Sequence, residues 1–132
     1  MSIRSAVLGL GFAFSGAAWA ADSDFDGVED DVDVCPIEDA SGHDFYVDGC
    51  VDTADDFAPF IEGLGLDEDA ETILVAIAHR VAMAVERDHM RLAVVQVHAA
   101  QAVARAFFRD DLITLDQKCA IYEFTQALMS TW

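Results

Sequence analysis

Basic residues are scarce in this 132-residue sequence, which has seven Lys or Arg against 25 Asp or Glu and a formal net charge of −18 at pH 7. No Lys or Arg occurs between Asp22 and Glu71, and that stretch holds nineteen acidic residues. Such a surface repels phosphates and anionic headgroups, which argues against binding to nucleic acid or to anionic membranes. It favours divalent cations, which bind carboxylate oxygens.

The sequence also lacks the common motifs of catalysis and of transition-metal binding. It contains no G-x-S-x-G, no H-E-x-x-H, no C-x-x-C and no pair of histidines one helical turn apart. Carboxylates are abundant, but no nucleophile stands beside a recognisable base. We therefore expect a protein that is not an enzyme.

Residues 1–20 have the features of a signal peptide. Arg4 supplies a positive charge, residues 6–14 form a short apolar core, and residues 18–20 read Ala-Trp-Ala, an A-x-A cleavage site. We expect cleavage after Ala20 and a periplasmic or secreted protein. The apolar core is too short to span a membrane comfortably, so we expect no transmembrane segment in the mature chain. Export implies oxidising conditions, in which cysteines pair.

Residues 22–33 have the spacing of a calcium-binding loop. Asp22, Asp24 and Asp26 stand at alternate positions, and a glycine that permits a sharp turn follows at once. Counted from Asp22, the EF-hand-like positions 7, 9 and 12 fall on three further residues. The EF-hand pattern has Glu at position 12, and the shorter aspartate here implies a tighter loop or a different coordination. The expected ligands are Asp22, Asp24, Asp26, the Val28 carbonyl, Asp30 and Asp33.

The longer run of residues 22–50 resembles the thrombospondin type 3 repeat. A Cys-Pro pair at Cys35 follows the acidic loop directly, and Val-Asp-Gly-Cys closes the run at Cys50. It is most similar to the single short copies found between domains of bacterial envelope proteins, including the OmpA family. The resemblance implies calcium bound by the aspartates and a disulfide between Cys35 and Cys50. A full repeat is also rich in aspartate in its second half, which here keeps only Asp44 and Asp48, and this leaves a second calcium ion open.

Composition also allows a plainer interpretation of residues 22–50. An acidic run of low hydrophobicity is often a solvated linker without fixed structure. The D-x-D-x-D-G spacing favours the calcium loop over this alternative, because an unstructured acidic run has no reason to keep that spacing.

Residues 53–132 are more apolar, and their helical periodicity predicts a bundle of three to four helices. We expect a short helix capped by Thr53, a second helix from Asp67 or Asp69, and a third with Asp88 as its N-cap. The alternative is that the second and third run together. A Thr114–Gln117 capping box predicts a last helix over about 115–129. The fold class is thus mostly α, with domains at 1–20, 21–52 and 53–132.

The periodicity also predicts which side chains form the core. Expected core positions are Phe57, Phe60, Ile61 and Leu64 in the first helix, and Ile73, Leu74, Ile77, Val81, Ala84 and Val85 in the second. In the third they are Leu92, Val95, Ala99, Val103, Ala106 and Phe107, and in the fourth Ile121, Phe124 and Leu128, with a second apolar face of Leu115, Cys119 and Tyr122. We expect Cys119 to be buried, and an intermolecular bond is its alternative.

Residues 57–129 are faintly similar, by patterning alone, to the FIMAH helical domain at the ends of bacterial secreted proteins. That similarity implies no chemistry. The helices nevertheless carry two polar groups of interest. His79, Met83, Glu86 and Met90 share one helical face near His89 and His98, a donor set that suits copper. Arg91, His98, Arg105 and Arg109 form a stripe that suits an anionic partner or the protein's own acidic half, and is otherwise a solvated face.

These patterns together predict an exported, calcium-binding structural or interaction protein of the cell envelope, with a role in adhesion implied only by the family resemblance. Its partner is an unidentified protein or envelope component, and neither partner nor oligomeric state follows from the sequence. The alternative is a periplasmic protein that binds or senses a transition metal such as copper through the histidines and methionines of the helices.

Overall fold

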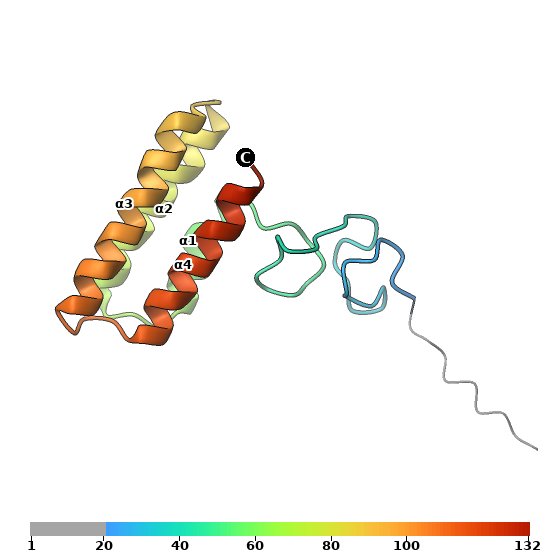
Figure 1. Ribbon diagram of the computed structural model, residues 1–132, viewed down its shortest axis with the longest axis horizontal. Helices are drawn as coiled ribbons and strands as arrows, with labels where there is room; N and C mark the ends of the chain where they lie inside the picture. Colours follow the sequence, from blue (N-terminus) through green and yellow to red (C-terminus); the bar gives the residue numbers. More distant parts are fainter. Residues whose placement is uncertain (1–20) are drawn as a thin grey trace, which may run out of the picture.

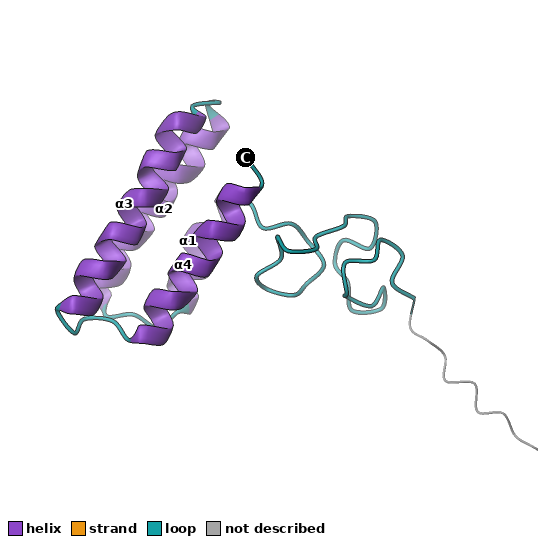
Figure 2. Ribbon diagram, in the orientation of Figure 1, coloured by secondary structure: helices purple, strands orange, loops and turns teal. Residues whose placement is uncertain are grey.

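The computed structural model describes residues 21–132, so the expected signal peptide and its cleavage site lie outside the described residues. Residues 21–52, here called the acidic segment, have turns and bends but no regular secondary structure (Figure 1). They are followed by the 3-10 helix η1 (Ala54–Asp56) and by four α-helices. These are α1 (Phe57–Gly63), α2 (Glu68–Glu86), α3 (Met90–Arg109) and α4 (Leu115–Ser130). Residues 21–132 contain no strand (Figure 2), which confirms the mostly α fold class.

Three helices, η1, α2 and α4, begin at the capping residues that the sequence predicts. Thr53 and Asp56 form a capping box at η1, and the Asp67 side chain accepts a hydrogen bond at the start of α2. At α4 the Gln117 backbone N–H donates to Thr114 Oγ1 at 3.2 Å, and the Thr114 N–H donates to Gln117 Oε1 at 2.8 Å. Each cap satisfies a backbone N–H that lacks a helical partner.

The turn between α2 and α3 differs from the prediction that Asp88 is an N-cap. Asp88 instead has a left-handed φ of 58°, and it closes α2. Its N–H donates to the Val85 carbonyl at 2.9 Å, and the His89 N–H donates to the Ala84 carbonyl at 2.8 Å. This is the Schellman arrangement of a helix C-terminus, in which aspartate tolerates the left-handed position. The two helices are therefore separate.

Aromatic rings of α1 and α4 form the centre of the core. The ring of Phe124 stacks on that of Phe60, with centroids 4.3 Å apart, and on that of Phe57 at 5.4 Å. Helix α2 packs against both α1 and α3, and α3 contacts α4. The predicted core residues Leu74, Ile77, Val81, Ile121, Phe124 and Leu128 are all buried, together with Phe57, Phe60 and Ile61.

The predicted core face of α3 is wrong at Leu92 and Val95 and holds in part at Val103 and Phe107, which pack against the core, and the α2 face is wrong at Ile73. Leu92 and Val95 are 47% and 59% exposed, and Ile73 of α2 is 45% exposed. The residues of α3 that are buried are Ala93, Val97, Ala100, Gln101 and Ala104. The helix is apolar on two adjacent strips, and the strip rich in alanine faces the core, since small side chains let neighbouring helices approach closely.

The second apolar face predicted for α4 is buried only in part, at Tyr122, whose hydroxyl donates to the Gln101 carbonyl of α3 at 3.3 Å. Leu115 is 53% exposed, and Cys119 is an exposed free cysteine rather than a buried one. Among the described residues, α4 packs against α3 and the aromatic rings of α1, and no further helix covers the side that carries Leu115. The sequence pattern of two apolar faces did not require two packing partners.

Phe45 attaches the acidic segment to the helices. Its ring meets that of Phe60 edge-on at 4.8 Å and that of Phe124 at 5.8 Å. His43 Nδ1 lies 2.8 Å from Ser130 Oγ at the end of α4. The segment therefore rests on the α1 and α4 side of the helices, which leaves its acidic loops outside the core (Figure 1).

Candidate metal site in the acidic segment

Carboxylates of the first loop bind the backbone of the same loop. Asp24 accepts a hydrogen bond from the Asp26 N–H at 3.3 Å, and Asp26 accepts one from the Val28 N–H at 2.8 Å. These are Asx turns, in which an aspartate side-chain oxygen accepts the backbone N–H bond that a carbonyl oxygen accepts in a helix or sheet. Asp22 accepts from the N–H groups of Phe25 at 2.8 Å and of Gly27 at 3.1 Å. Gly27 has φ 98°, which supplies the sharp turn that the sequence predicts.

This curl brings Asp22, Asp24 and Asp26 together. Each offers a carboxylate oxygen, and the three oxygens lie within 4.8 Å of one another, so these residues could hold a metal ion. The second oxygens of Asp24 and Asp26 are buried and have no hydrogen-bond partner among residues 21–132. Burial raises the pKa of Asp24 above its ordinary 3.8, and repulsion from the carboxylates of Asp26 and Asp33 raises it further, against a lowering by the Asp26 N–H.

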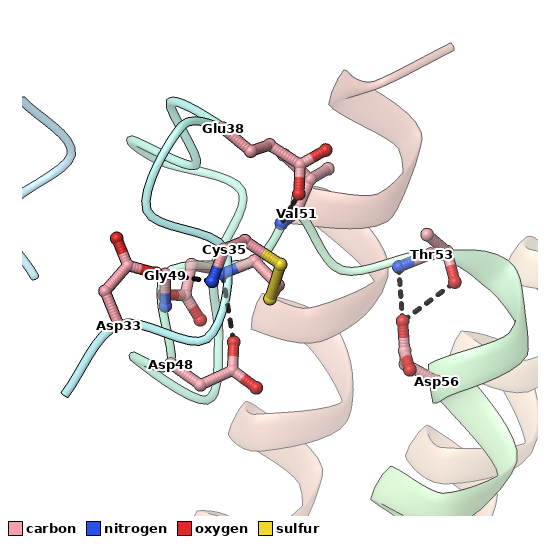
Figure 3. Close-up of a disulfide and its surroundings, with 10 residues drawn as sticks. Asp33, Cys35, Glu38, Asp48, Gly49, Val51, Thr53 and Asp56 are labelled. Atoms are coloured by element: carbon pink, nitrogen blue, oxygen red, sulfur yellow. Dashed lines mark hydrogen bonds between the residues drawn. A yellow bond between two sulfur atoms is a disulfide. The ribbon is translucent and has the colours of Figure 1, made fainter. Parts of the chain in front are cut away.

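Asp33 reaches the first loop from its far end. Its Oδ1 accepts a hydrogen bond from the Cys35 N–H at 2.7 Å, and its Oδ2 is buried without a partner. Gly49 lies against this carboxylate (Figure 3). A Cβ at Gly49 would overlap the Asp33 carboxylate, so glycine is required there for space as well as for its φ of +82°.

A disulfide between Cys35 and Cys50 holds the two ends of this turn, as the family resemblance implies (Figure 3). The Val34 N–H also donates to the Asp48 carbonyl at 2.8 Å. Cys35 and Cys50 lie close to the Glu38 carboxylate, but their sulfurs are bonded to each other and do not bind a metal as thiolates. That carboxylate accepts a hydrogen bond from the Val51 N–H at 3.3 Å.

The structure places the remaining predicted ligands differently. Both oxygens of Asp30 accept hydrogen bonds from Ser23, from its N–H at 2.8 Å and from its hydroxyl at 2.7 Å. The side chain of Val28 is buried at 7% exposure, and its role as a carbonyl ligand stays a prediction. The structure thus groups three of the predicted carboxylates, leaves Asp33 outside that group, and binds Asp30 to a serine.

One carboxylate of interest was missed by sequence reasoning. Asp44 Oδ2 accepts a hydrogen bond from the Gly49 N–H at 2.8 Å, whereas its Oδ1 is buried without a partner. The sequence analysis named Asp44 only with Asp48, as the aspartates kept in the second half of the repeat, and this pair lacks the alternation of the first loop. Asp52 nearby is 5% exposed and accepts a hydrogen bond from the Phe45 N–H.

The copper-type candidates on the helices are mostly exposed, and two of them, Met83 and His89, line one depression between α2 and α3. His79, Met83, Glu86 and His89 are exposed, as is His98. Among residues 21–132, no group of three His, Cys, Asp or Glu side chains placed to share an ion contains a histidine. The basic stripe of α3 is exposed too, and its one ion pair in the described part of the chain joins Arg109 to its neighbour Asp110 at 3.3 Å. It therefore makes no ion pair with the acidic segment of the same chain.

No protein-family model, curated protein or solved structure matches the chain. The thrombospondin type 3 resemblance of residues 22–50 and the FIMAH similarity of residues 57–129 thus stay predictions from the sequence. Within residues 21–132, none of the helices has the length and hydropathy needed to cross a membrane.

Proposed function

We propose that this is an exported protein of the cell envelope that binds calcium through its acidic segment and serves a structural or interaction role, without catalysis. The observation that carries the proposal is a set of buried carboxylate oxygens with no hydrogen-bond partner in the described residues. They are Asp24 Oδ2, Asp26 Oδ2, Asp33 Oδ2 and Asp44 Oδ1. Burying a charged oxygen without a partner is costly, and a bound cation removes that cost.

The donors favour calcium over other cations. They are carboxylates, and hard oxygen donors suit calcium or magnesium rather than copper or zinc. Calcium accepts six to eight oxygens in flexible geometry, whereas magnesium requires a near-ideal octahedron and retains water. A loop built from Asx turns, with side chains of different reach, fits the more tolerant ion.

A bound cation would also order the segment. Residues 21–52 contain twelve acidic residues and no basic one, so they repel one another unless a cation neutralises them. Cation binding and folding of this segment are then coupled. With the Cys35–Cys50 disulfide and the Phe45 anchor, the filled segment would form a rigid arm on the helices. Export rests on the signal-peptide features of residues 1–20 and on the disulfide.

Calorimetric titration with calcium, with magnesium as the competing ion, tests the proposal. We expect about one calcium per chain to bind in preference to magnesium. The double substitution Asp24→Asn and Asp26→Asn should abolish this binding while helical circular dichroism stays nearly unchanged. Asp31→Asn is the matched control, because Asp31 is exposed and belongs to the same segment. Absence of binding at millimolar calcium, or an equal loss in the control, would contradict the proposal.

Asp30 sharpens the same experiment. If its carboxylate stays on Ser23 in the calcium-bound protein, Asp30→Asn should weaken calcium binding much less than Asp24→Asn. If the two substitutions weaken binding equally, the Asp30 carboxylate gives up its hydrogen bonds with Ser23 and coordinates the calcium ion, as position 9 of the loop predicts.

A further inference from the structure

A depression of about 160 Å³ lies between the C-terminal part of α2 and the N-terminal part of α3. We call it the tip groove, and it is lined by Arg80, Met83, Ala84, Arg87, His89, Leu92 and Gln96. Met83 and Leu92 are 45% and 47% exposed, so apolar surface lies beside the arginines. No carboxylate lines the groove, in a chain that has more than three acidic residues for every basic one.

The arginines of the tip groove have no acidic partner in the described part of the chain. The ion pair found there is at the other end of α3, between Arg109 and Asp110. The acidic side chains nearest in sequence face elsewhere: Glu86 lines a separate depression with Thr53 and Asp55, and Asp88 lies in the turn. Unpaired arginines beside exposed apolar side chains suit a partner that offers carboxylates next to an apolar side chain.

The acidic segment of the same protein carries such a feature. Ile37 is 93% exposed and is followed directly by the exposed carboxylates of Glu38 and Asp39. The hydroxyl and N–H of Ser41 lower the pKa of Asp39, so it is ionised at neutral pH. Within one chain the acidic segment packs on the rings of α1 and α4, away from the tip of α2 and α3 (Figure 1). The two complementary surfaces are therefore free to meet between chains.

We propose that the tip groove binds residues 37–39 of a second copy of this chain. Ile37 would lie against Met83 and Leu92, and the carboxylates of Glu38 and Asp39 would pair with Arg80 and Arg87. The contact joins different surfaces of the two copies, so repetition produces a head-to-tail chain or a closed ring. It does not use Asp22, Asp24 or Asp26, so the residues of this contact are separate from the proposed calcium ligands.

Magnitudes indicate a weak, salt-dependent contact. The surfaces are small, and exposed ion pairs contribute about 0.2–1 kcal/mol each. The net charge of −18 on each copy opposes association, but salt of about 0.1 M screens charges more than about 10 Å apart and leaves the local pairs. Association should therefore be visible at high protein concentration in about 0.15 M salt and should weaken towards about 0.5 M.

Sedimentation equilibrium tests the proposal by comparing the wild type with charge-reversal variants at protein concentrations up to about 1 mM. The wild type should show a concentration-dependent rise in mass. Reversing the groove with R80E and R87E, or the segment with E38R and D39R, should each weaken association about tenfold or more. An equimolar mixture of these two variants should restore association, because the reversed segment then meets the reversed groove.

The matched control is R105E with R109E, which makes the same change in net charge at the other end of α3. It should associate like the wild type. A wild type that stays monomeric, an equal loss in the control, or a mixture that fails to associate would each overturn the proposal. All the substituted side chains are exposed, and helical circular dichroism verifies folding. Should the reversed groove variant be unfolded, R80Q with R87Q replaces it and should still weaken association.

Discussion

The acidic segment and the helices satisfy their backbones by different means. In the helices the N–H groups beyond the first turn pair with carbonyls of the preceding turn, and apolar side chains are packed into one core. In the acidic segment Val28 and Ala40 are the only buried hydrophobic residues, and many N–H groups donate to aspartate side chains. The second oxygens of several of these aspartates then turn inward without partners.

This difference explains why the candidate metal site lies in the region with little core. Asx turns hold a carboxylate by one oxygen and leave the other free, so successive aspartates present oxygens to one point. A helix would place the same side chains around its axis and disperse them. The segment compensates for its small core with a disulfide and with aromatic contacts to the helices, of which those of Phe45 are the shortest.

The largest expected effect comes from removing the ring that the two regions share. Phe124→Ala removes the stack on Phe57 and Phe60 and the edge contact with Phe45. We expect a loss of about 3–5 kcal/mol in the free energy of unfolding, because a fully buried ring leaves a cavity. Urea denaturation measures it, with Phe108→Ala as the control at a partly exposed ring. Equal losses in the two variants would contradict a shared aromatic centre.

The disulfide should matter to one region only. Replacing Cys35 and Cys50 with serine opens a loop with a sequence separation of 15, which is worth about 3 kcal/mol in the chain-entropy model. Hydrogen exchange should accelerate across residues 21–52, while helical circular dichroism persists. Cys119→Ser is the control and should change neither, since Cys119 is exposed and unpaired in the described structure. Loss of the helices in the double variant would mean that the two regions fold as one unit.

Alanine substitutions at two glycines of the acidic segment distinguish the cost of backbone strain from the cost of steric overlap. Gly42 and Gly49 both have left-handed φ values, +77° and +82°, so alanine is strained at either. An added Cβ meets nothing at Gly42 but overlaps Asp33 at Gly49. We expect Gly49→Ala to cost about 1–2 kcal/mol more than Gly42→Ala and to weaken calcium binding as well. Thermal unfolding and calcium titration of the pair measure this, and equal behaviour would remove Asp33 from the site.

The smallest expected effect concerns Asp52, at the junction of the two regions. Burial raises the pKa of Asp52, the Phe45 N–H opposes the rise, and Asp44, Asp56 and Asp48 add to it. The folded state therefore holds this proton more tightly than the unfolded state, whose pKa is near 3.8. The stability contribution of Asp52 is then largest below pH 3.8 and is lost as pH rises towards the folded pKa.

Asp52→Asn keeps an acceptor for the Phe45 N–H and removes the charge. With a chelator present, we expect the melting temperature of this variant to fall less than that of the wild type as the pH rises from 4 to 7. Asp55→Asn serves as the control at an exposed carboxylate. A variant that follows the wild-type pH profile would show that Asp52 does not titrate differently on folding.

Features that depend on a few neighbouring residues agreed with the sequence predictions. The caps at Thr53, Asp67 and Thr114 and the grouping of Asp22, Asp24 and Asp26 need contacts over at most five residues. Asp30 is a residue whose partner the local sequence pattern did not predict. Position 9 of the loop predicted a ligand, but a serine seven residues earlier supplies two hydrogen bonds to the same carboxylate. Nothing in the local pattern distinguishes these two arrangements.

The sequence by itself determined where η1, α2 and α4 begin, that the chain is mostly α, and that the acidic residues stand where Asx turns can gather them. These features depend on local hydrogen bonds and on residue periodicity. Only the tertiary structure decided that the alanine strip of α3 is buried, that Leu92 and Cys119 are exposed, and that Phe45 joins the two regions. A helix that is apolar on two strips has two ways to pack, and which one is realised depends on the shape of its neighbours.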